Sequence, residues 1–75
     1  MIKIQYDAEV DALYIEFKQL LPGTAENREL SEDVIANYSP DGKLAGLEIL
    51  NASAVLDEKL QKIVVEVSNT QHSAA

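Results

Sequence analysis

Carboxylates gather near the start of the chain, where Asp7, Glu9 and Asp11 alternate along one short stretch. Carboxylate oxygens are the ligands that hard cations such as Ca²⁺ and Mg²⁺ prefer, so this stretch is a candidate metal site. An EF-hand loop also requires glycine at its sixth position and glutamate at its twelfth. Counted from Asp7, those positions hold Ala12 and Lys18. We therefore expect the three acidic side chains to close the turn and to keep the protein soluble. Binding of a divalent metal or a small ligand is the alternative function.

The other residue types that could do chemistry do not form a catalytic set. Glu29, Glu32 and Asp33 make a second acidic group, but nothing around them indicates the burial that would split the pKa values of paired carboxyls. The single histidine, His72, lies in a polar tail, and no serine has the spacing of a nucleophile elbow. The three glycines stand apart, so no phosphate-binding loop is present. We expect a protein that is not an enzyme and that uses no cofactor.

Net charge narrows the classes of partner. Thirteen acidic residues oppose six basic ones, which gives a formal charge of −7, and the bases are spread along the chain. Direct binding to nucleic acid is therefore not expected, whereas a small basic protein would be attracted. No apolar run approaches the roughly 20 residues of a membrane span, and the start lacks the apolar core of a signal peptide. Because the chain also has no cysteine, we expect a cytoplasmic protein.

Apolar residues alternate with polar ones in several segments, as in half-buried strands. This pattern predicts strands over residues 2–6, 13–17, 24–30, 34–38 and 43–50. The third is charged and irregular, as expected of an edge strand. Ser39-Pro40-Asp41-Gly42 has the residue order of a type I turn, so it joins the last two strands. Gly46 interrupts the final strand and indicates a bulge or a close approach of another group.

A helix is expected to follow, with Asn51 as its N-cap and apolar residues at helical spacing as far as Ile63. The β-branched residues 63–67 fit either a helix or a strand, and we favour an extended segment there. The expected fold is α+β: an antiparallel β-meander of about four to five strands packed by one C-terminal helix. Residues 1–67 form a single domain, and residues 68–75 are expected to be a disordered polar tail.

Two segments resemble a known family when they are taken together. They are Tyr6-Asp7-x-x-x-Asp11-x-Leu13-Tyr14-Ile15 and, after Asp41-Gly42, Gly46-Leu47-Glu48-Ile49-Leu50-Asn51-Ala52-Ser53. This combination is similar to the small bacterial family catalogued as domain of unknown function 2283, over about residues 1–56. The resemblance implies a short protein with a compact sheet and helix. Some relatives look like antitoxins of two-gene toxin–antitoxin loci, and the family supplies no agreed site residues.

Five residues are our candidates for a partner surface: Asp7, Glu9, Asp11, Tyr14 and Glu48. Tyrosine is enriched at protein interfaces, although a cross-strand pair with Tyr6 or Tyr38 is the favoured explanation of Tyr14. We consider two roles for Glu48: it forms a cross-strand ion pair with a base such as Lys3 or Lys18, or it contacts a partner.

The chain is also expected to form a homodimer. A small core without disulfides is marginal, and apolar residues are in surplus at Ile63, Val64, Val65 and Val67.

Overall fold

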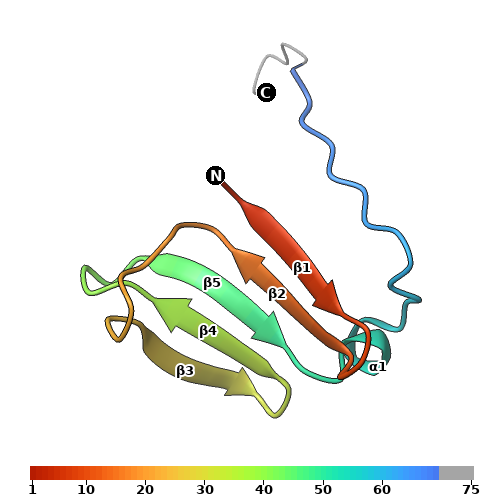
Figure 1. Cartoon of the computed structure of the whole chain (residues 1–75), viewed down its shortest axis with the longest axis horizontal. Coiled ribbons are helices and arrows are strands. Elements are labelled where there is room, and N and C mark those ends of the chain that lie inside the picture. Colours follow the sequence, from red (N-terminus) through yellow and green to blue (C-terminus); the bar gives the residue numbers. More distant parts are fainter. Residues whose placement is uncertain (70–75) are drawn as a thin grey trace, which may run out of the picture.

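One open sheet makes up most of the molecule in the computed structural model, which describes residues 1–69 (Figure 1). The strands are β1 (Lys3–Asp7), β2 (Ala12–Glu16), β3 (Glu26–Ser31), β4 (Val34–Tyr38) and β5 (Leu44–Ile49). All paired strands are antiparallel, and one short helix, α1 (Ala52–Leu56), follows β5. The predicted α+β class, with an antiparallel sheet and a single helix after it, is confirmed.

The strand order differs from the meander that we expected. A meander would place the strands in chain order, whereas the observed order is β1-β2-β5-β4-β3. The last strand therefore lies in the middle of the sheet. Burial explains this position, because β5 contains the buried residues Ala45, Gly46 and Ile49, while every residue of β3 is exposed. The charged β3 occupies an edge, as predicted for residues 24–30.

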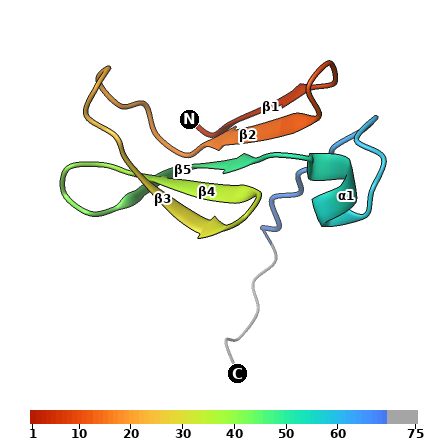
Figure 2. The same cartoon turned by 90° about the horizontal axis from the view of Figure 1, so that it is seen from below.

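The core lies on one face of the sheet and is small. Leu13, Ile49 and Ala52 are buried together. The half-buried residues that pack against them are Ile4, Tyr6, Val34 and Leu60. Figure 2 shows α1 at one end of the sheet, so the helix covers only the part of the face that lies near this cluster.

The helix is much shorter than predicted. We expected it to run from Asn51 to near Ile63, but it covers five residues, Ala52–Leu56. Asn51 precedes it in a left-handed conformation, with φ of 51°, and its side chain makes no capping hydrogen bond. The helix ends because Asp57 adopts φ of 52°, so the expected apolar stripe is not laid along the sheet.

The segment after the helix leaves the sheet. Residues 62–67 belong to no helix or paired strand, which agrees with the non-helical interpretation of residues 63–67. Figures 1 and 2 show this segment standing apart from β1. The polar tail expected over residues 68–75 falls mostly at positions 70–75, outside the described residues. Within residues 1–69, no helix is long and apolar enough to span a membrane.

The turn between β4 and β5 forms as predicted. The Gly42 amide donates a hydrogen bond of 2.9 Å to the Ser39 carbonyl, and Gly42 has φ of 83°. The carboxylate of Asp41 accepts hydrogen bonds from the Ser39 hydroxyl and the Lys43 amide. The Ser39 hydrogen bond is the main cause that lowers the pKa of Asp41. The Asp41 carboxylate therefore stabilises the closed turn.

Candidate functional site

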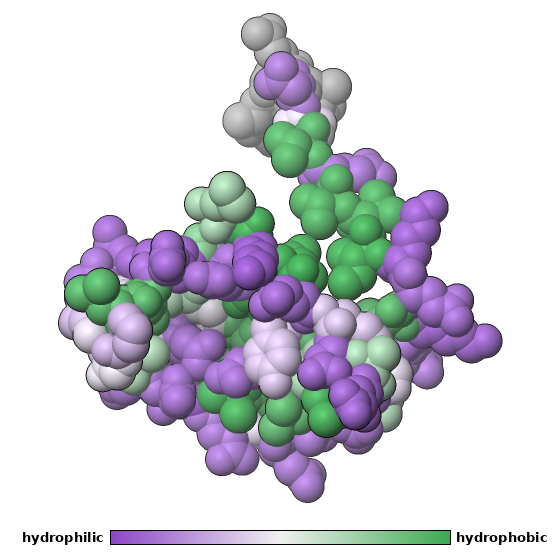
Figure 3. Space-filling model, viewed as in Figure 1, coloured by the Kyte–Doolittle hydropathy of each residue, from purple (hydrophilic) through white to green (hydrophobic). Residues whose placement is uncertain are grey.

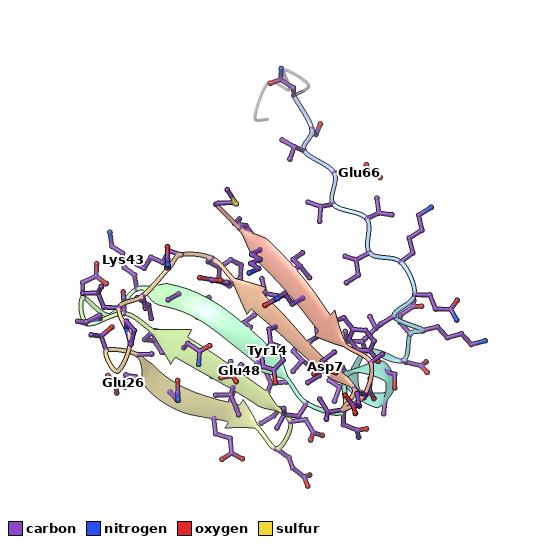
Figure 4. All side chains as sticks on the ribbon, in the orientation of Figure 1. Asp7, Tyr14, Glu26, Lys43, Glu48 and Glu66 are labelled. Carbon is purple, nitrogen blue, oxygen red and sulfur yellow. The ribbon has the colours of Figure 1, made fainter. Side chains whose placement is uncertain are left out.

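The face of the sheet opposite the core carries Tyr14 and Glu48 at its centre. The two residues are directly paired across β2 and β5, and Tyr14 is paired with Gln5 of β1 on its other side. Figure 4 shows the two labelled side chains close together over the middle of the sheet. Tyr14 is 37% exposed.

The predicted pair of Tyr14 with Tyr6 or Tyr38 is wrong. Tyr6 is paired with Leu13 and packs against the core, and Tyr38 is paired with Leu44 and Glu26. Tyr14 therefore has no aromatic cross-strand partner, and its ring lies on the face of the sheet opposite the core.

Glu48 is oriented by hydrogen bonding. The side-chain nitrogen of Asn37 donates to Glu48 Oε2 at 2.9 Å and to Asn27 Oδ1 at 2.7 Å. The ion pair with Lys3 or Lys18 that we considered is not among the salt bridges of residues 1–69, and Lys18 Nζ lies 3.8 Å from Asp41 instead. The carboxylate is thus positioned by an amide and keeps its negative charge available on this face.

A shallow hollow of about 410 Å³ lies on the same face. Residues of mixed charge surround it, among them Lys3, Tyr14, Glu16, Lys18, Asn37 and Glu48. Gly46 contributes to its floor. A Cβ atom at Gly46 would lie 2.9 Å from the Ile15 carbonyl oxygen and 3.1 Å from Asn37 Oδ1, so only glycine lets these groups approach. The close approach expected at Gly46 is confirmed.

The three acids of the first turn do not converge. Asp7 Oδ1 accepts a hydrogen bond of 3.0 Å from the Glu9 amide, as in an Asx turn, while the Glu9 side chain is exposed. Asp11 is directed toward the helix. Among residues 1–69, no three histidine, cysteine or acidic side chains are grouped so that they could hold a metal ion.

Asp11 joins the first hairpin to α1. Its Oδ1 accepts hydrogen bonds from the Tyr6 hydroxyl at 2.5 Å and the Ser53 amide at 3.1 Å. Its Oδ2 accepts one of 2.6 Å from the Ser53 hydroxyl, and its backbone carbonyl accepts one of 2.9 Å from the Ala52 amide. Asp11 therefore accepts the hydrogen bonds of the free amides at the start of α1, which is the capping role that we had predicted for Asn51.

These hydrogen bonds shift two pKa values in opposite directions. The Ser53 and Tyr6 hydroxyls hold the pKa of Asp11 below its ordinary value, because both stabilise the carboxylate. The hydrogen bond to Asp11 raises the pKa of Tyr6, because it stabilises the neutral phenol. Asp11 thus has a structural role on the core side of the sheet.

Of the five candidate residues, only Tyr14 and Glu48 are directly paired across two strands, while Asp7 lines a second hollow together with Tyr14. Asp7 lies in β1 near its end, on the same face by alternation, and Glu9 lies in the turn beyond it. Sequence reasoning missed Asn37, which orients Glu48. The sequence did contain a signal for Asn37, because this residue lies in a strand four positions before the turn residue Asp41. Alternation in that strand places the Asn37 side chain on the face opposite the core.

Comparison with known proteins agrees with the resemblance of the two sequence segments. The family described as "Protein of unknown function (DUF2283)" matches residues 3–53, which span all five strands and the first residues of α1. No curated protein matches the chain, and no solved structure does. The match covers more than half of the 75 residues, so the chain belongs to the DUF2283 family.

Proposed function

We propose that the protein is a non-enzymatic interaction module that binds a small basic protein through its polar sheet face. The observation that carries this proposal is the pairing of a partly exposed Tyr14 with a Glu48 carboxylate that is already held by Asn37. We call the surface around these residues, together with the hollow over Gly46, the polar face.

At the centre of the polar face, Tyr14 and Glu48 offer the groups that bind a cationic side chain. Tyrosine is among the residues that contribute most to interface energies, and it offers a large contact area at low entropic cost. The hydrogen bond from Asn37 fixes Glu48 before binding, so little additional ordering is required when a lysine or arginine approaches.

Long-range electrostatics supports the same class of partner. The formal charge of −7 attracts a basic protein during diffusional encounter, which raises the association rate at low ionic strength. An antitoxin-like role, with a basic toxin as the partner and the bacterial cytoplasm as the location, is the specific form of this proposal that the family resemblance supports.

Metal binding at Asp7, Glu9 and Asp11 gains no support from the geometry. Asp11 is engaged by Tyr6 and Ser53, and the other two carboxylates do not join it. We therefore do not propose a second function.

Co-purification at low salt from the source organism tests the proposal, with identification of the bound protein and measurement of its affinity. We expect a partner with a basic isoelectric point, bound more weakly as salt rises. Glu48→Gln and Tyr14→Ala should each weaken binding about tenfold or more, which corresponds to about 1.4 kcal/mol.

Glu58→Gln is the matched control for Glu48→Gln. It removes the same charge from an exposed position near the end of α1, so it should leave the affinity nearly unchanged. Equal effects of Glu48→Gln and Glu58→Gln would contradict the proposal, as would a partner that is acidic or binds independently of salt.

A further inference from the structure

Residues 62–67, which we call the arm, expose apolar side chains on an unpaired backbone. Ile63 is 43% exposed, and Val64, Val65 and Val67 are 66%, 68% and 91% exposed. Within the described part of the chain, the backbone groups of these four residues make no backbone hydrogen bond. Figure 3 shows their hydrophobic atoms gathered along the arm, away from the sheet. A β-branched segment in this state is suited to pairing with another strand.

The β1 edge of the sheet offers a place for this segment. β1 is paired only with β2, so one side of its backbone is open. By alternation it directs Ile4 and Tyr6 toward the core face and Lys3, Gln5 and Asp7 toward the polar face. The other edge, β3, is less suited, since it is charged and its register shifts between Glu29 and Ser31.

We propose that the arm of one copy adds as an antiparallel sixth strand to β1 of a second copy, and that the exchange is reciprocal. With Val65 opposite Ile4, five of the six pairs match in kind, and Val64 lies opposite the polar residue Gln5. The pairs are Ile63–Tyr6 and Val67–Ile2 on the apolar side, and Lys62–Asp7 and Glu66–Lys3 on the polar side. A slide of two residues in either direction keeps the faces matched but loses both charge pairs, so the register is specific.

The partner strand comes from a second copy because the arm leads away from its own sheet. Leu60 packs against the core cluster, and the chain beyond it stands apart from its own β1 in both views (Figures 1 and 2). A two-fold exchange covers both arms and both β1 edges, which is the arrangement of an isologous dimer. This proposal does not rest on Tyr14, on Glu48 or on their partner, although Lys3 borders both surfaces.

Sedimentation equilibrium of the full-length protein tests the exchange. We expect a mass of twice 8.2 kDa. Val65→Lys should weaken dimerisation at least tenfold, because it puts a charge among the apolar pairs. Val10→Lys is the matched control, since Val10 is 63% exposed in the first turn and is not part of the interface, so it should leave the dimer intact.

A charge exchange tests the register. Glu66→Lys and Lys3→Glu should each weaken the dimer, and the double variant should restore it. Amide hydrogen exchange should show protection of the arm that rises with protein concentration. A mass of 8.2 kDa at high concentration, with folding confirmed by circular dichroism, would overturn the proposal. A monomer whose arm amides are protected would also overturn it, since the arm would then pair with its own β1.

Discussion

Replacement of Gly46 by alanine would place a Cβ atom 2.9 Å from the Ile15 carbonyl oxygen and 3.1 Å from Asn37 Oδ1. Carbon and oxygen atoms in favourable contact are about 3.5 Å apart, so the strands must separate by several tenths of an ångström. The nearer of the two atoms belongs to the backbone of β2, which is paired with β5 and cannot swing aside like a side chain. Gly46→Ala therefore strains the centre of the sheet.

The expected cost follows from two opposing effects. Overpacking of a well-packed site costs about 1–3 kcal/mol. Restriction of the unfolded chain when alanine replaces glycine returns about 0.4–1 kcal/mol. The free energy of unfolding of Gly46→Ala should therefore be lower by about 1–2 kcal/mol, which lowers the melting temperature by roughly 5–15 °C for a domain of this size.

Urea titration followed by circular dichroism measures this difference, and Gly46→Val sharpens it. Strand propensity alone would make valine better than alanine at this position. Steric contact predicts the opposite order, because the additional methyl groups of valine meet the same crowded surroundings. If either variant is as stable as the original protein, or if valine is tolerated better than alanine, the close approach of the strands at Gly46 is refuted.

Three further predictions concern hydrogen bonds. The lowered pKa of Asp11 means that its contribution to stability is present above the unfolded value of about 3.9 and is lost as the pH falls through the lower folded pKa. In urea titrations, the stability difference between the original protein and Asp11→Asn should therefore shrink in acid. The pKa of Tyr6 is raised by its hydrogen bond to Asp11, so tyrosinate absorbance that is absent in Tyr6→Phe should appear above pH ~10. Asn37→Asp replaces the donor to Glu48 by an acceptor, so urea titration at neutral pH should show a free energy of unfolding lower by about 1–2 kcal/mol.

Each of these three predictions would be contradicted by a specific result. A stability difference for Asp11→Asn that stays constant down to strongly acid pH would mean that the carboxylate is not favoured in the folded protein. Tyr6 ionisation at or below the ordinary value would exclude the hydrogen bond to Asp11. An Asn37→Asp variant as stable as the original protein would show that Asn37 does not hold Glu48.

Alternation along the chain was enough to predict the strands, and turn-forming residues were enough to predict the turn before the last strand. Leu13 and Ile15 share the core side, and Ser39 to Gly42 form the expected turn. Such signals are local, because the side-chain period and turn geometry depend on neighbouring residues. Strand order is not local: the pairing of Leu13 with Ile49 joins segments far apart in the sequence, and no short pattern encodes it.

The helix and the candidate site show the same difference between local signals and long-range pairing. Asn51 has the residue type of an N-cap, but the cap is supplied by Asp11, which lies 42 positions before its partner Ser53. The exposed face of Tyr14 could be inferred from alternation, whereas its neighbours could not, since they depend on β5 being inserted beside β2. The hydrogen bond from Asn37 to Glu48 could not be predicted for the same reason, because it depends on the pairing of β4 with β5.

Site-specific photo-crosslinking inside the cell tests the proposed function most directly. Replacement Tyr14→p-benzoyl-L-phenylalanine puts the reactive group on the polar face, and the same replacement at Phe17 serves as a control beyond the end of β2. The account predicts a covalent adduct with a small basic protein from position 14, lost when Glu48→Lys is added, and little adduct from position 17. An absence of adduct at position 14, or an adduct there with a second copy of the chain alone, would contradict it.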